Sequence, residues 1–464
     1  MKYLLLFIAF PAWAALTPQA VRESALKFHP TVRGAVDRMI AGEESVRGAR
    51  GAFDTKLVAD HYRVASGFWA RTMSDVMFEK PLQVANSKVY AGYSYGFNGM
   101  FPPQFSTVST NSGGTPRVGA STSVWRHRSI DPARAVLRAS EFDAQIARGE
   151  KDLTFWDIGR LSEIAYWEWV TAQRIETVYE NLLKNGEARN GFLVSRAQRG
   201  DAPQILVREN EQYIANRKAG LMAATERRIR AEYALSLFLR NENGEPTLPA
   251  ENEAFQDYPQ DFAPMLASDE LNANVEEIAR RRPDIANLGA DFEKSRIDLE
   301  LAEQDLKPKV DVWGDYTRNI GNEDPQNPPH IWSFGVRLEI PIERNLGKGN
   351  IAAAKSRQSA AQRHWDLGRQ TYQTEVLANK RALALQLGRV EQAAVELARA
   401  RQLVEAESYK LKSGGGNLFL VNLREEAAAN AEASWHESRF GFMSTLLSYQ
   451  ALVKVSDNPS RGRP

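Results

Sequence analysis

The stretch Trp332-Ser-Phe334-Gly-Val336-Arg-Leu338-Glu-Ile340-Pro-Ile342 decides the fold. Large apolar residues occupy every second position, which is the period of a β-strand with one apolar and one polar face. No proline follows from Ile342 until Pro459, and this region is rich in the strong helix formers Ala, Leu, Gln, Glu and Arg. The run Ser413–Asn417, with its three glycines, is the one clear interruption. We therefore expect an amphipathic strand, a helix of about 65 residues, a tight turn and a helix of about 40 residues.

Length, charge and cysteine content exclude several classes of protein. The 464 residues are enough for two or three ordinary domains, and the formal net charge is only +1. No global field therefore attracts nucleic acid, and we expect no nucleic-acid partner. The chain has no cysteine, which excludes disulfides, thiolate metal sites, a Cys nucleophile and acylation of an N-terminal Cys. The protein is expected not to be lipidated.

The first 14 residues have the features of a secretory signal peptide. Lys2 supplies a positive end, Tyr3–Phe10 is a short apolar core, and Ala12-Trp13-Ala14 is a small-x-small cleavage site. The alternative is an N-terminal anchor, but this run is too short to span roughly 30 Å of hydrocarbon. No later run approaches the length of a transmembrane helix. We expect an exported protein whose membrane part, if it has one, consists of strands.

The remainder of the chain alternates between helical and strand-like patterns. Helices are expected over 17–53, from Asp131-Pro132 for about 65 residues, over Gln204–Asn241 and over 269–307. Strands are expected within Leu57–Gly67, Lys88–Phe97, Arg117–Trp125, Val310–Thr317 and 332–342, with exposed loops at Asn98–Pro116 and Asn319–Pro329. Residues 245–270 contain four prolines and seven acidic residues without Lys or Arg, which is typical of a solvated linker.

The order helix, strands, long helix, Gly-marked turn and shorter helix occurs twice. His29-Pro30 matches Arg282-Pro283 at an offset of 253, whereas Gly200 matches Gly415 at an offset of 215. The difference makes the first copy 38 residues longer, and the extra length falls in Phe68–Arg117. The predicted division is a signal peptide at 1–14, a first repeat at 15–242, an acidic Pro-rich linker at 243–268, a second repeat at 269–456 and a tail at 457–464.

The helix that follows Ile342 carries an apolar stripe with a period near that of a coiled coil. Its members are spaced three or four residues apart: Leu383, Leu387, Val390, Ala394, Leu397, Ala400 and Val404. Ala occupies many other positions, so that neighbouring helices can approach closely on more than one side. This favours a helix packed laterally into a tube of helices. An ordinary two-stranded coiled coil is the alternative, and the strands argue against it.

These features together resemble the TolC family of bacterial outer-membrane export ducts. The resemblance rests on the duplicated plan, on Arg281-Arg282-Pro283-Asp284-Ile285, on Leu338-Glu-Ile340-Pro341-Ile342, on Gly347-x-Gly349-Asn-Ile351-x-x-Ala354 and on the tip glycines 200 and 415. It implies a mainly α protein with a membrane β part, in which a homotrimer forms a 12-stranded β-barrel joined to a coiled-coil α-helical tube. Each copy would supply four strands. Physical reasoning agrees, because four strands leave two open edges that lipid does not tolerate.

The resemblance also assigns the two faces of the strands. The residues expected to face outer-membrane lipid are Val310, Val312, Tyr316, Phe334, Val336, Leu338 and Ile340. Those expected to face the lumen are Asp311, Asp315, Arg337 and Glu339. Pro341 would form the strand-to-helix corner. In the first copy Trp125 stands where Pro341 should have its counterpart, so the corner after Val124 stays open. The extra strand-like segment at 88–97 leaves open which two segments of that copy enter the barrel.

The hairpin tips would lie at the periplasmic end, where this family constricts. Family members often carry Asp shortly after the tip glycine, but Leu206 and Val421 stand at those positions here. The residues expected at the tip and gate are Gly200, Asp201, Leu206, Glu209, Gly415, Val421, Arg424 and Glu425. Their charges, with those of Arg208, Glu211 and Glu426, either hold the gate or are ordinary solvated helix-end charges. Alternatively, Leu206 and Val421 form an apolar constriction that gates by dewetting.

No sequence motif indicates catalysis. The six histidines show no metal-ligand spacing, and the chain contains neither Gly-x-Ser-x-Gly nor a phosphate loop. We therefore expect no enzyme, metal or cofactor. The hypothesis is an outer-membrane channel, extending into the periplasm, that acts as the passive exit duct of a tripartite efflux pump or type I secretion system. Its partners would be an inner-membrane pump and a periplasmic adaptor docking near Gly200 and Gly415. The alternative is a soluble periplasmic coiled-coil adaptor or scaffold.

Overall fold

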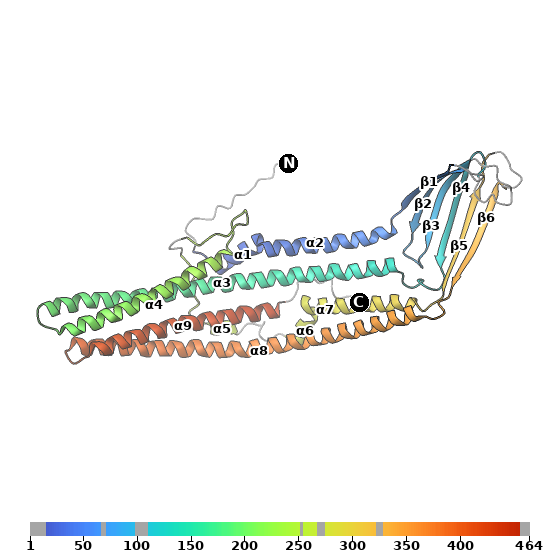
Figure 1. Cartoon of the computed structure of the whole chain (residues 1–464). Helices are drawn as coiled ribbons and strands as arrows, with labels where there is room; N and C mark the ends of the chain where they lie inside the picture. The colour runs from blue at the N-terminus through green and yellow to red at the C-terminus, as the bar shows by residue number, and fades with distance from the viewer. Residues whose placement is uncertain are drawn as a thin grey trace. The chain divides into compact units, whose positions relative to one another are not determined.

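The computed structural model describes residues 15–65, 71–97, 110–250, 254–266, 274–321 and 328–454. The predicted signal peptide and the predicted tail lie outside these residues. The helices are α1 (Pro18–Phe28), α2 (Pro30–Arg50), η1 (Gly51–Phe53), α3 (Pro132–Gln198), α4 (Gln204–Ser236), α5 (Ala263–Leu266), α6 (Val275–Arg281), α7 (Pro283–Gln304), α8 (Asn345–Lys412) and α9 (Leu418–Val453) (Figure 1). The strands are β1 (Lys56–Val64), β2 (Arg71–Pro81), β3 (Lys88–Phe97), β4 (Thr115–Ser123), β5 (Lys309–Arg318) and β6 (His330–Glu339).

Both long helices form as the sequence predicts. α3 has 67 residues and α8 has 68, each followed by a glycine-marked turn and a shorter helix, α4 or α9. The helices expected over 17–53 and 269–307 are each broken, because Pro30 and Pro283 follow a residue with extended backbone. Among the helices that the structure describes, none is both long enough and apolar enough to cross a membrane.

The strands form a single antiparallel sheet in the order β1-β2-β3-β4-β5-β6. The described residues contribute six strands to this sheet, two more than the four per copy that the resemblance implies for the barrel. The sequence pattern misses β2, in which the consecutive apolar residues Val76, Met77 and Phe78 break the period of two. The additional length of the first copy is therefore a β2–β3 hairpin inserted between β1 and β4.

The chain divides into two compact units, and each unit takes segments from both halves of the chain. Unit 1 comprises 1–37, 150–284 and 369–464, and unit 2 comprises 38–149 and 285–368. Unit 2 contains the whole sheet, whereas unit 1 contains α4, α9 and both hairpin turns. The compact units thus do not coincide with the two repeats.

Aromatic residues of α3 form the centre of the core in unit 1. Tyr166, Trp167 and Trp169 are buried, and the Tyr166 hydroxyl donates to the backbone carbonyl of Leu16 at 2.8 Å. Tyr258, from the predicted linker, stacks on Trp167 with a centroid distance of 4.6 Å. Burial raises the pKa values of Tyr166 and Tyr258. The aromatic cluster is thus a packing core that also anchors the linker.

Arg282 explains the Arg-Pro-Asp motif at the junction of α6 and α7. Its guanidinium donates to the carbonyl oxygens of Ala451 and Leu452, 2.9 and 2.5 Å away, at the end of α9. It also forms a bidentate pair with Asp284, and its CZ atom lies 5.0 Å from the Tyr372 ring centroid. The side chain therefore donates to helix-terminal carbonyls of α9, where the Tyr372 hydroxyl also donates to Leu452 at 3.1 Å.

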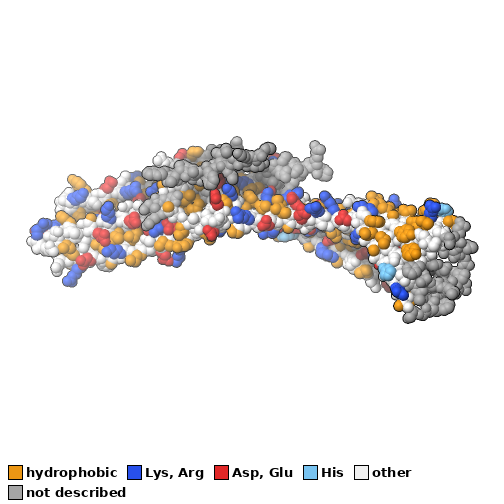
Figure 2. Space-filling view, turned by 90° about the horizontal axis from the view of Figure 1, so that it is seen from above, with side chains coloured by type: hydrophobic (Ala, Val, Ile, Leu, Met, Phe, Trp, Pro, Cys, Tyr) orange, Lys and Arg blue, Asp and Glu red, His pale blue; other side chains and the backbone are white. Residues whose placement is uncertain are grey.

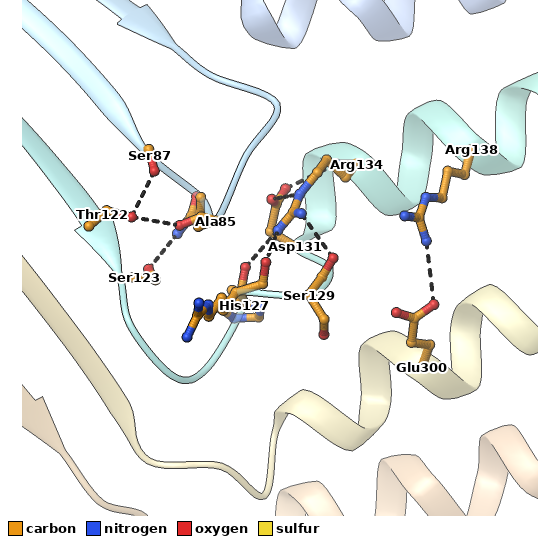
Figure 3. A network of polar contacts seen from close by, with 12 residues as sticks. Ala85, Ser87, Thr122, Ser123, His127, Ser129, Asp131, Arg134, Arg138 and Glu300 are labelled. Carbon is orange, nitrogen blue, oxygen red and sulfur yellow. Dashed lines mark hydrogen bonds and ion pairs between the residues drawn. The ribbon is translucent and has the colours of Figure 1, made fainter.

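Arg134, in the first turn of α3, holds the corner between β4 and α3, where Trp125 stands in place of a proline (Figure 3). Arg134 donates to the carbonyl oxygens of His127, Arg128 and Ser129, at 2.7, 3.1 and 2.9 Å, and pairs with Asp131. The Asp131 carboxylate also accepts from the Arg134 backbone N–H at 3.0 Å, which caps the helix. One side chain thus fixes the loop that replaces the expected proline corner.

Candidate functional site

The first candidate surface is the sheet of unit 2, which has one apolar face. The register aligns Leu57, Phe78, Ala91, Val118, Tyr316 and Trp332 across the six strands. Phe334 is 78 % exposed and Val336 is 70 % exposed. Figure 2 shows hydrophobic side chains clustered over the strand region. Exposed apolar surface on this scale marks a surface that contacts another protein or a membrane.

The residues predicted to face lipid share this face, with one exception. Val310, Val312 and Tyr316 pair with Leu338, Val336 and Trp332, and Gly314 pairs with Phe334. Ile340 lies beyond the end of β6 at Glu339, so its assignment to the strand is wrong. Pro341 lies in the connection between β6 and α8, where Arg344 adopts a positive φ of 58°.

The opposite face of the sheet is polar and carries the residues predicted to face the lumen. Asp311 and Lys309 stand opposite Arg337 and Glu339. Asp315 is buried and forms an ion pair of 2.9 Å with Arg117 on β4. The polar face continues onto the inserted hairpin, where Lys88 pairs with Glu79 at 3.2 Å and Ser94 donates to Asp75 at 2.5 Å. This face can line a water-filled space.

The second candidate surface is the pair of hairpin tips in unit 1, which share one turn geometry. Gly200 and Gly414 have φ values of +79° and +84°, and the next residue, Asp201 or Gly415, donates to the carbonyl oxygen five residues earlier. This is the Schellman motif that ends a helix with glycine. The equivalent of Gly200 is therefore Gly414 rather than Gly415, and the two helices that follow begin 214 residues apart.

This register changes the expected pair of gate residues. Val421 corresponds to Val207 rather than to Leu206, and both valines are buried. Val421 is only 1 % exposed and Leu206 packs against a cluster of Leu193, Val207 and Leu418. Because Val421 faces the interior of unit 1, the predicted apolar constriction by Leu206 and Val421 does not fit this conformation.

The other residues predicted at the tip differ in their surroundings. Asp201 is exposed and pairs with Arg199 at 3.3 Å, and Glu209 is exposed, so both fit ordinary solvated charges. Arg424 is half-buried. Glu425 is 11 % exposed at its side chain and lies within a polar network.

Two arginines converge on Glu425 from the first hairpin. Arg189 on α3 pairs with Glu425 and donates to the Asn422 Oδ1 atom at 2.5 Å. Arg217 on α4 pairs with the other carboxylate oxygen at 2.9 Å and donates to the Leu182 carbonyl oxygen at 2.9 Å. The Arg217 side chain is only 3 % exposed. The network thus joins α3, α4 and α9 through one carboxylate and two cations.

Glu425 is among the residues predicted at the tip, whereas neither arginine is. Arg189 and Arg217 lie within long helices that contain many charged residues, so nothing in the sequence separates them from solvated neighbours. One sequence feature that the structure links to Arg217 is Gly186 on α3. A Cβ atom at this position would lie 2.8 Å from the Arg217 Nη1 atom. A glycine inside a helix can mark such close approach of a neighbouring side chain.

A buried histidine lies farther along α9. Burial, with a smaller effect of nearby Arg439, lowers the pKa of His436 to about 4. Arg439 stacks on the rings of Tyr258 and Trp435, with its CZ atom 4.5 Å from each centroid. Among the described residues, no group of three or more His, Asp or Glu side chains could hold a metal ion.

The fold is that of known outer-membrane channels. The chain aligns with a membrane protein from Pseudomonas aeruginosa at a TM-score of 0.68 and 15 % identity, covering 94 % of this chain and 93 % of the other. The Campylobacter jejuni CmeC outer membrane channel aligns at a TM-score of 0.66 and 12 % identity, covering 94 % of this chain and 85 % of the other. The open state of the Neisseria gonorrhoeae MtrE outer membrane channel aligns at a TM-score of 0.65 and 16 % identity, covering 94 % of this chain and 88 % of the other.

No family model and no curated protein matches the sequence. The structural likeness extends over nearly the whole chain, and it confirms at the level of fold the resemblance to the TolC family of outer-membrane channels. The molecule thus has the fold of these outer membrane channels, with an amphipathic sheet in one unit and paired helical hairpins in the other.

Proposed function

We propose that this protein is an export duct of the outer membrane, the passive exit of a tripartite efflux pump or type I secretion system. The observation that carries the proposal is the exposed apolar face that crosses all six strands, opposite a face of paired charges. A soluble protein would bury such a face in its core, whereas lipid would cover it in a membrane protein. The likeness to channels rather than enzymes supports a role without catalysis.

The duct is a homotrimer whose sheets close into one barrel and whose helices form a periplasmic tube. A single copy leaves both sheet edges open among its described strands, and open edges do not persist in the hydrocarbon region. The two repeats, 15–242 and 269–456, supply equivalent helical hairpins, and the segment at 243–268 joins them. An inner-membrane pump supplies the energy, and a periplasmic adaptor docks near Gly200 and Gly414.

The Arg189–Glu425–Arg217 network holds the periplasmic end of the duct in one arrangement. It links the α3–α4 hairpin to α9, so that moving one hairpin relative to the other breaks charge-assisted bonds in a buried site. Tip residues Asp201 and Glu209 remain available to a partner because they face solvent. The soluble periplasmic adaptor is the rival, and it offers no role for the apolar face.

The test is the molar mass of membrane-extracted protein by light scattering in detergent, compared with the 52.0 kDa chain. We expect a particle of three chains that is absent from the soluble fraction. A monomer or dimer that stays soluble without detergent would overturn the duct and favour the periplasmic adaptor.

A further inference from the structure

The sheet contains two more strands than the four that each copy was expected to supply. We infer that all six strands of each copy enter the membrane wall, so that β1 of one copy pairs with β6 of the next and three copies enclose 18 strands. The inference rests on the proposed trimeric duct and specifies how its copies meet. The partner at each open edge is thus a second copy of this chain.

All six strands have the length that a membrane strand needs. Their lengths are 9, 11, 10, 9, 10 and 10 residues in chain order. A tilted strand of about 9–11 residues spans the hydrocarbon core. A hairpin that merely decorated a four-stranded wall would have no reason to match this length.

The inserted hairpin shares both faces of the sheet. On β2 and β3 the residues Val76, Phe78, Val89 and Tyr93 are exposed on the apolar face, each more than 40 %. The Lys88–Glu79 ion pair and the Ser94–Asp75 hydrogen bond of the hairpin lie on the polar face beside Arg117. The apolar face therefore continues through β2 and β3 at Phe78, Val76 and Ala91, and toward the other end of β2 it carries Ser74, 2.8 Å from His61 of β1.

The turn of the hairpin is short and anchored. Ala85 and Asn86 have φ values of 49° and 46°, which is the geometry of the primed turns that join antiparallel strands. Ala85 accepts the backbone N–H of Ser123 at 3.1 Å, and the Ser87 hydroxyl lies 2.7 Å from that of Thr122 (Figure 3). The turn is thus bonded to the end of β4 and belongs to the wall.

Strand parity allows the edges of neighbouring copies to pair. In an antiparallel meander of six strands, β1 and β6 run in opposite directions, so β1 of one copy meets β6 of the next as an antiparallel pair. Barrel diameter grows roughly linearly with strand number, so 18 strands enclose roughly 1.5 times the diameter of 12. The outer opening is correspondingly wide.

The first test places single nitroxide labels on β2 in trimers reconstituted into phospholipid vesicles. The chain has no native cysteine, so Val76→Cys, Met77→Cys and Phe78→Cys each give one label. We expect oxygen to relax the labels at 76 and 78, and a water-soluble nickel complex to relax the label at 77. If the nickel complex relaxes the labels at 76 and 78 in a particle of three chains, the inference is overturned, whereas the proposed function as a duct stands.

The second test joins neighbouring copies by oxidation. Ala59→Cys on β1 is combined in turn with Phe334→Cys, Val336→Cys and Leu338→Cys on β6, which together cover adjacent registers. We expect covalent dimers and trimers from at least one combination, and none when Tyr93→Cys on β3 replaces Ala59→Cys. Cross-linking through the Cys at position 93 would overturn the inference. The absence of cross-linking through either position 59 or position 93, in a particle of three chains, would also overturn it. A soluble monomer would instead overturn the proposed function itself.

Discussion

Replacing Glu425 with Gln tests the network that joins the two hairpins. The substitution keeps the shape of the side chain but removes the one carboxylate that faces Arg189 and Arg217. The two guanidinium groups, 17 % and 3 % exposed, then lie together without an anion. Breaking a buried ion pair by removing one partner costs about 3–5 kcal/mol. The lower end applies here, because Arg189 retains some solvent and Gln still accepts one hydrogen bond.

A loss of about 3 kcal/mol raises the population of locally opened states roughly 150-fold. The assay is amide hydrogen exchange across Asn422–Ala429 in the detergent-extracted protein, under conditions where the rate follows the opening equilibrium. Glu426→Gln is the matched control, since it changes the same charge one residue away. Glu426 accepts only a 3.4 Å contact from Asn216, so exchange should change less than about threefold.

The combination Glu425→Gln with Arg189→Gln separates charge imbalance from simple loss of contacts. Removing one of the two unpaired cations should recover about 1 kcal/mol, seen as roughly fivefold slower exchange than in Glu425→Gln alone. If Glu425→Gln leaves exchange within threefold of the unaltered protein, the network does not hold the hairpins together. Additive effects in the double variant, judged against Arg189→Gln alone, would likewise contradict coupling between Glu425 and Arg189.

Three other perturbations probe the sheet, the corner and the buried histidine. Val336→Arg places a charge on the apolar face, which costs about 2–4 kcal/mol at the bilayer midplane, and should abolish recovery of the protein from the outer membrane. The control Ser333→Arg, on the polar face, should be recovered normally. Equal recovery of the two variants would contradict the assignment of faces. Arg134→Lys removes the planar guanidinium that donates to three carbonyl oxygens and pairs with Asp131. Hydrogen exchange of the 124–131 amides should therefore rise roughly tenfold. The control Arg138→Lys, whose side chain contacts Glu300 at 3.4 Å, should leave this exchange rate unchanged. The pKa of His436 is lowered to about 4 in the folded protein, so as pH falls the imidazole of the unfolded chain is protonated before that of the folded chain. The free energy of unfolding should therefore fall by about 2–3 kcal/mol between about pH 6.5 and 4. His436→Gln should remove this part of the difference between urea midpoints at pH 7.5 and 4.5, and an unchanged difference would contradict it.

The helices could be predicted from the sequence because each depends on local signals. Proline-free runs rich in helix formers gave α3 and α8 to within a few residues. The breaks at Pro30 and Pro283, by contrast, fall inside segments that were each expected to form one helix. The tip register could not be fixed in the same way. Three successive glycines, Gly414 to Gly416, each accept the left-handed conformation, so the sequence does not reveal which one adopts it.

The sheet was harder to predict because its strands carry weaker signals. β6 alternates clearly, because Trp332, Phe334, Val336 and Leu338 lie on one face and Ser333, Arg337 and Glu339 lie on the other. β2 places Met77 on the polar face next to Val76 and Phe78, which hides the period of two. One part of the candidate site could be predicted from the sequence and the other could not. The faces of β5 and β6 follow from the alternation of residues along each strand. Arg189 and Arg217 contact Glu425 only through the tertiary packing of the helices, which no local pattern encodes.

The two repeats differ in a way that the architecture itself restricts. Each repeat supplies a long helix and a shorter one, so the helical part keeps its twofold plan, while the first repeat supplies four strands and the second supplies two. An insertion between a helix and the next helix must return the chain to the end of the sheet at which it began. Only whole hairpins do this, and only an even number of strands leaves edges that pair in antiparallel fashion with a second copy. The β2–β3 hairpin is therefore the smallest addition that widens the sheet and preserves both the helical hairpins and the opposite directions of the two edge strands.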